Sequence, residues 1–110
     1  MPEYAEITIT VKNGVISCQP DPGQCYWATG PADVRWTTQS SPSGATLVEV
    51  MWKAKSPFSG QSQSGGSLGP ITTSGNLQVA GEFGYTVRFI DSQGRVVLQV
   101  DPTIRNNDRP

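Results

Sequence analysis

The sequence contains no histidine and only two cysteines in 110 residues. Without histidine the chain can build neither a Ser-His-Asp triad nor a Cys-His pair, the common nucleophilic sites of hydrolases. Most catalytic zinc sites also need histidine ligands. We therefore expect a non-catalytic protein with no metal site and no cofactor.

Charge is also sparse, with 8 basic and 9 acidic residues and a formal net charge of -1. Neither sign forms a run, whereas nucleic acids and anionic membranes attract dense positive surfaces. No stretch approaches the roughly 18 apolar residues of a membrane-spanning helix. Residues 1–11 lack the basic and apolar regions of a signal peptide. We expect a cytoplasmic protein that binds neither nucleic acid nor membrane; export after removal of a leader is the alternative.

The patterns that are present are those of short strands joined by turns. Glycine and proline contribute 12 and 9 residues, and no segment shows a helical period. Residues 7–11 alternate Ile or Val with Thr, as a half-buried strand does, and Asn13-Gly14 favours a two-residue hairpin turn. Counting back from this turn places Cys18 opposite Ile9, on the inward face of a sheet.

Three further segments complete the predicted core. Residues 34–38 and 45–55 alternate again, and residues 85–100 predict a hairpin in which Val87 pairs with Leu98. The aromatic residues expected in the core are Trp36, Trp52, Tyr85 and Phe89. Six to eight short strands without helices predict an all-β fold, an antiparallel two-sheet sandwich with immunoglobulin-like or cupredoxin-like Greek-key topology.

The length fits one domain, residues 1–110. Residues 56–75 are rich in Ser and Gly, and such a stretch buries too little apolar surface to offset its ordering entropy. We expect a long mobile loop there, with a short edge strand at 71–73. Residues 101–110 are polar and interrupted by proline, and they predict a tail that lies on the surface.

Two families of β-sandwich share features with one segment of the chain. Gly81-Glu-Phe-Gly-Tyr-Thr-Val87 resembles the penultimate strand of cupredoxins, and residues 85–94 resemble the F–G hairpin of bacterial immunoglobulin-like domains. Both resemblances imply a sandwich. Val87 occupies the position of the copper-ligating cysteine, and a blue-copper site also needs two histidines. The resemblance therefore implies a sandwich without copper.

The segment CQPDPGQC holds both cysteines, Cys18 and Cys25, around a turn. A reversible redox pair needs an exposed thiol of low pKa, whereas Cys18 faces the core near the acidic Asp21. A metal clip needs four soft ligands, which only a dimer would supply. Two structural readings remain open. Geometry favours a disulfide that closes the short loop, and a reducing cytoplasm favours two buried thiols.

Aromatic residues near predicted strand ends form the candidate binding surface: Tyr26, Trp27, Phe58 and Phe83. Gathered at one end of the sandwich, they would bind a sugar or a peptide; caps of the core are the alternative. We expect a binding or interaction module whose partner is a protein or small ligand, with a homodimer through a sheet edge as another mode of association. The alternatives are a redox-responsive protein that uses Cys18 and Cys25, and a carboxylate-based hydrolase.

Overall fold

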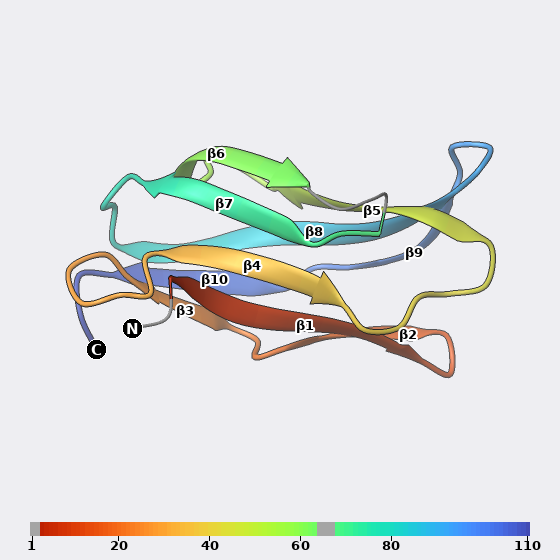
Figure 1. Ribbon diagram of the computed structural model, residues 1–110, viewed down its shortest axis with the longest axis horizontal. Helices are drawn as coiled ribbons and strands as arrows, with labels where there is room; N and C mark the ends of the chain where they lie inside the picture. The colour runs from red at the N-terminus through yellow and green to blue at the C-terminus, as the bar shows by residue number, and fades with distance from the viewer. Residues whose placement is uncertain (1–2, 64–67) are drawn as a thin grey trace.

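The computed structural model describes residues 3–63 and 68–110, and in this part of the chain the secondary structure is entirely β (Figure 1). The described residues contain no helix that is long and apolar enough to span a membrane. Ten strands follow one another: β1 (Tyr4–Lys12), β2 (Val15–Gln19), β3 (Gly23–Tyr26), β4 (Asp33–Thr38), β5 (Ala45–Trp52), β6 (Phe58–Gln63), β7 (Ile71–Asn76), β8 (Gly81–Asp91), β9 (Val96–Val100) and β10 (Thr103–Asn107).

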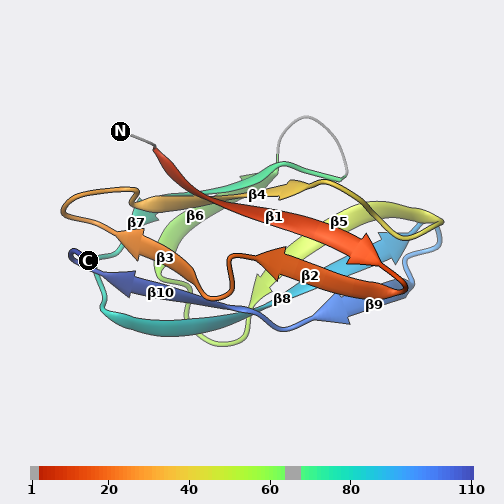
Figure 2. The same cartoon turned by 90° about the horizontal axis from the view of Figure 1, so that it is seen from below.

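These strands form two sheets packed face to face, which confirms the predicted all-β sandwich (Figures 1 and 2). Sheet A has the order β2-β1-β4-β7-β6, and sheet B has the order β3-β10-β8-β5. Strand β9 pairs with the C-terminal part of β8, on the side away from β5. The sheets are mixed and not purely antiparallel, because β1 runs parallel to β4 and β3 runs parallel to β10.

The predicted register of the first hairpin is correct, and that of the second is not. In the first hairpin Ile9 pairs with Cys18, as counted from the Asn13-Gly14 turn. In the second, Val87 pairs with Val100 and not with Leu98, a shift of two residues. A bulge at Phe89/Ile90 and a longer turn produce the shift. The side chain of Asp91 stabilises that turn by accepting hydrogen bonds from the backbone N–H groups of residues 93 and 95, both at 2.9 Å.

The core lies between the sheets and contains the aromatic residues that alternation predicts. Trp36, Tyr85 and Phe89 are fully buried, and Trp52 is half-buried beside them. The Trp36 Nε1–H donates a hydrogen bond to the Tyr85 hydroxyl at 3.1 Å, which joins β4 of sheet A to β8 of sheet B. The Trp52 ring centroid lies 6.1 Å from that of Trp36 and 5.5 Å from that of Tyr85.

The prediction of a long loop over residues 56–75 was wrong, because strands β6 and β7 form an antiparallel hairpin there. The short strand predicted at 71–73 is part of β7, but β7 lies between β4 and β6 and not at the edge of the sheet. Two apolar anchors, Phe58 and Ile71, are 4% and 3% exposed and hold the hairpin against the core. Backbone hydrogen bonds between β6 and β7 also stabilise the hairpin, and a count of apolar side chains does not include them. Residues 64–67 of the predicted loop lie outside the described residues.

The prediction of a surface tail over residues 101–110 was also wrong. Strand β10 lies inside sheet B, paired with β3 on one side and β8 on the other. Ile104 and Asn106 point into the core and have no exposed surface. The Asn106 amide is tolerated there because it bonds with the Asn76 side chain and with the backbone carbonyl of Val79.

The chain changes sheets at both sides of the sandwich. Residues 20–22 connect β2 of sheet A with β3 of sheet B, and residues 53–57 connect β5 of sheet B with β6 of sheet A. Strands β5 and β6 are therefore edge strands of different sheets on the same side of the molecule (Figure 1). Among the described residues no backbone ladder joins β5 to β6, so this side of the sandwich is open.

Candidate functional site

The predicted aromatic surface does not form a single patch. Tyr26 ends β3, at one edge of sheet B, and its hydroxyl donates a hydrogen bond to the Gln24 side chain at 3.3 Å. Trp27 follows it, half-buried, and its backbone N–H bonds to the Asn107 carbonyl at 3.1 Å. Strand β6, which carries Phe58, is the opposite edge of the sandwich. Tyr26 and Phe58 are thus held apart by the fold.

The other two predicted residues have different environments. Phe58 is 4% exposed and packs against Trp52 with a centroid distance of 5.8 Å, so it is a core residue and not part of an exposed surface. Phe83 in β8 is half-buried and lines a hollow with Lys53 and Lys55 at the end of β5. Of the four aromatics, only Phe58 contributes to the groove described next, as part of its wall.

The cysteines are free thiols in the structure, and each is buried. Cys18 belongs to β2 of sheet A and Cys25 to β3 of sheet B. Burial raises the pKa of each thiol to about 12, and the charges of Asp21 and Asp33 add to the effect at Cys18 and Cys25 respectively. A thiol that keeps its proton in this way is a poor nucleophile.

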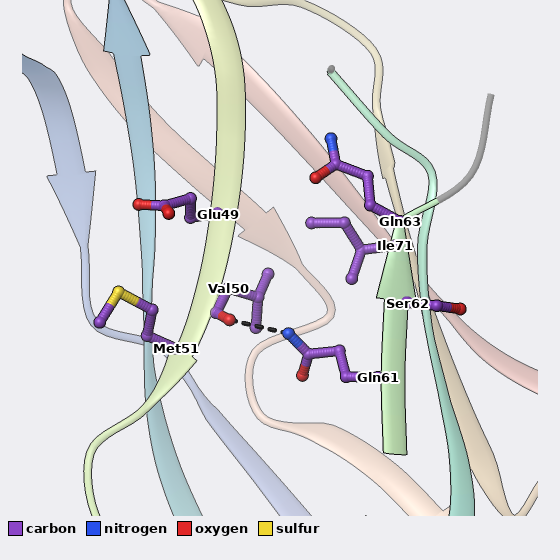
Figure 3. Close-up of a pocket in the computed structure, with 7 residues that line it drawn as sticks. All are labelled: Glu49, Val50, Met51, Gln61, Ser62, Gln63 and Ile71. Carbon is purple, nitrogen blue, oxygen red and sulfur yellow. Dashed lines mark hydrogen bonds between the residues drawn. The ribbon is translucent and has the colours of Figure 1, made fainter. Parts of the chain in front are cut away.

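The open side of the sandwich carries a groove between β5 and β6. Its first hollow has a volume of about 240 Å³. Figure 3 shows Gln61 and Gln63 on β6 and Ile71 on β7 reaching toward β5, where Val50 faces them. Val50 and Ile71 are buried and form an apolar floor, while the two glutamine amides supply polar walls. Glu49, Met51 and Ser62 also border this hollow, but their side chains point away from it (Figure 3).

The Gln61 side chain spans the groove. Its Nε2 donates a hydrogen bond of 2.8 Å to the Val50 carbonyl on β5, drawn as the dashed line in Figure 3. Its Oε1 accepts a hydrogen bond of 3.0 Å from the Trp52 indole N–H. One amide therefore occupies a donor and an acceptor of the facing strand, and these two bonds fix the orientation of the Gln61 side chain.

A second hollow, also of about 240 Å³, lies on the same groove, and Gln61 lines both hollows. The Trp52 ring forms its aromatic wall; Phe58 also borders this hollow but is buried and packs against Trp52, with the two ring planes inclined by 48°. Ser56, Ser59 and Gly60 complete it. The groove thus offers aromatic carbon in one hollow and side-chain amides in the other, with the Gln61 amide between them.

The groove carries almost no net charge. Among the described residues that border the two hollows, Glu49 is the only ionisable one, and its side chain points away from the groove (Figure 3). Its carboxylate accepts a hydrogen bond from Arg88 at 3.2 Å, within an ion pair on the outer face of sheet B. The site therefore neither attracts nor repels ions strongly, and one carboxylate alone cannot form the acid–base pair of a glycosidase.

Most residues of the groove were not predicted from the sequence. Gln61 and Gln63 fall within the segment predicted to be a loop, and Trp52 was assigned to the core alone. The signal that could have found them is the pair of apolar residues, Phe58 and Ile71, which begin β6 and β7. A hairpin that begins with these two residues would place the glutamines at a sheet edge. The alternation of residues within one strand, however, does not reveal which strand of the other sheet they face.

The described residues also contain no cluster of three or more metal-ligating side chains. Comparison of the chain with protein-family models, with curated proteins and with solved structures gives no match. We therefore infer the function from the chemistry of the chain's own residues.

Proposed function

We propose that the protein is a non-catalytic binding module that takes its ligand in the groove between β5 and β6. The observation that carries the proposal is the Gln61 amide, which two hydrogen bonds hold across the groove with a hollow on each side. Polar groups held in place before a ligand arrives lower the entropic cost of binding. Rigid edge strands position them, as a binding site requires.

The chemistry of the groove supports binding more than catalysis. Its lining side chains are amides, hydroxyls, apolar groups and a single ion-paired carboxylate. None of these is a nucleophile activated by a neighbouring base. The redox alternative has less support, because Cys18 and Cys25 are buried and keep their protons.

The finer family assignment belongs to the same proposal. We infer a cupredoxin-like or immunoglobulin-like sandwich without copper. Its support is the segment 81–94, which forms β8 and its turn, with Val87 fully buried at the position where cupredoxins carry a ligand.

A fragment screen by ¹H–¹⁵N NMR tests the proposed site. We expect small polar fragments to shift the backbone resonances of residues 49–52 and 59–63, and to leave those of the turn at 91–95 unchanged. The Gln61→Ala variant should lose these responses. Gln93→Ala is the matched control, because Gln93 is exposed in the turn between β8 and β9. Fragments that bind only at other residues, or that bind Gln61→Ala as well as the wild type, would contradict the proposal.

A further inference from the structure

The class of ligand that suits the groove follows from three of its properties. The first is neutrality combined with hydrogen-bonding capacity. The polar residues that border the groove include two glutamines and three serines. Among the described residues that border it, the only ionisable one is Glu49, whose side chain points away from the groove (Figure 3) and is paired with Arg88. Amides both donate and accept hydrogen bonds, as do alcohols. The groove is thus matched to a ligand whose polar groups are uncharged hydroxyls.

The second property is the aromatic wall of one hollow. Trp52 is half-buried, and contacts with Trp36, Tyr85 and Phe58 fix its ring at centroid distances between 5.5 and 6.1 Å. A rigid aromatic surface next to hydrogen-bonding groups suits a molecule that is apolar on its faces and polar at its rim. A sugar ring has this distribution, with C–H groups on its faces and hydroxyls around its edge.

The third property is that the edge of β5 is already covered. An extended peptide docks at a sheet edge by pairing with free backbone groups. Here the Val50 carbonyl accepts a hydrogen bond from the Gln61 side chain, at the middle of the groove. A peptide strand would have to displace that amide before it could pair with β5. A ligand that bonds to the side-chain amides would leave the hydrogen bond between Gln61 and Val50 in place.

We infer that the groove binds a neutral oligosaccharide, with adjacent sugar units in the two hollows on either side of Gln61. This inference rests on the proposed function and names the ligand class of the same site. Each hollow, at about 240 Å³, is smaller than a typical site for a drug-sized molecule, which starts at about 300 Å³. One small unit in each hollow therefore fits better than one large ligand.

The test is a titration of the intact chain, followed by NMR, with neutral disaccharides as probes: cellobiose, maltose, lactose and N,N′-diacetylchitobiose. We expect at least one of them to shift the resonances of residues 49–52 and 59–63. Protons on one of its sugar units should move upfield, because they lie over an aromatic ring; a purely structural role of Trp52 would not produce this signature. Gln61→Ala should weaken the binding about tenfold, roughly the contribution of one hydrogen bond, and Gln93→Ala should leave it unchanged.

Two controls separate this inference from the proposed function. A disaccharide that carries a uronic acid should bind more weakly than its neutral counterpart, because the described groove residues offer no cation to compensate for the water that its carboxylate would lose. An unstructured peptide with alternating Val and Thr should not shift residues 49–52. If fragments bind the groove but every neutral disaccharide fails, the sugar assignment is overturned and the binding site stands. If the acidic sugar or the peptide binds more tightly, the assignment is likewise overturned. If disaccharides bind at other residues, both proposals fail.

Discussion

Replacing Asn106 with alanine should destabilise the protein more than its place near the chain's end suggests. The side chain has no exposed surface and belongs to β10, at the centre of sheet B. Its Nδ2 donates hydrogen bonds of 3.0 Å to the Asn76 side chain and to the Val79 carbonyl, and its Oδ1 accepts one of 2.8 Å from Asn76. Because Asn76 lies in β7 of sheet A, this pair of amides ties the two sheets together.

The magnitude follows from those three bonds. A buried hydrogen bond contributes about 0.5–1.5 kcal/mol net, and a partner left without one adds to the loss. Asn106→Ala removes all three and leaves the Val79 carbonyl without its side-chain donor. The free energy of unfolding should fall by about 2–4 kcal/mol. With a urea slope of about 2 kcal/mol per molar, the midpoint of unfolding should fall by about 1–2 M.

Equilibrium urea denaturation, followed by tryptophan fluorescence, measures this change. Asn107→Ala is the matched control: this half-buried neighbour has the same side chain, but among the described residues its hydrogen bond outside the strand ladders is made by the backbone carbonyl, to the Trp27 N–H. We expect its effect to stay within about 0.5 kcal/mol. The double variant with Asn76→Ala should show a coupling energy of about 0.5–3 kcal/mol. Equal losses in Asn106→Ala and Asn107→Ala would refute the role assigned to the buried amide pair.

Three further predictions concern the core and the thiols. Gly23→Ala should destabilise the protein by about 1–3 kcal/mol in thermal or urea unfolding, because the new Cβ would lie 2.8 Å from the Cδ1 atoms of both Ile7 and Ile104; an unchanged midpoint would contradict the packing described at β3. Tyr85→Phe should cost about 1–3 kcal/mol, since it leaves the buried Trp36 indole N–H without an acceptor, whereas Tyr26→Phe, at a partly exposed hydroxyl, should change stability little. Cys18 and Cys25 should resist alkylation by iodoacetamide at pH 8 until the protein unfolds. Burial raises the pKa values of both thiols from 9.0 to about 12, so their contribution to stability is complete below pH 9 and is lost as the pH rises toward 12. A Cys18→Ala/Cys25→Ala variant should therefore lose less stability over that range than the wild type. An equal loss would contradict the burial of the two thiols as the cause.

Strong local signals in the sequence predicted the parts of the fold that were correct. The Asn13-Gly14 turn fixes the register of β1 and β2, because a two-residue turn leaves no freedom in the pairing. Alternation placed Trp36 and Tyr85 in the core, since a strand with one buried face has a period of two. The same period explains why the register error in the last hairpin left Leu98 and Val100 on the predicted face, since a shift of two residues preserves the face. Val96, predicted to lie inward opposite Phe89, is instead 45% exposed, because the bulge at Phe89/Ile90 pairs it with Ile90.

The parts that could not be predicted depend on distant partners. Strand β10 has a polar sequence, and only the pairing with β3 and β8 and the bonds of Asn106 make it a central strand. Backbone hydrogen bonds between β6 and β7 stabilise these two strands, and amino-acid composition does not predict such pairing. The groove depends on which edge strands face each other across the two sheets. That arrangement follows from the whole topology and from no single segment.

A crystal structure of the chain grown with cellobiose, or with whichever neutral disaccharide binds in the titration, tests the central claim most directly. We predict one sugar unit against Trp52 and the next against Val50 and Gln63, with the Gln61 amide in contact with both. A disaccharide seated elsewhere on the sandwich, with the groove between β5 and β6 unoccupied, would contradict the account.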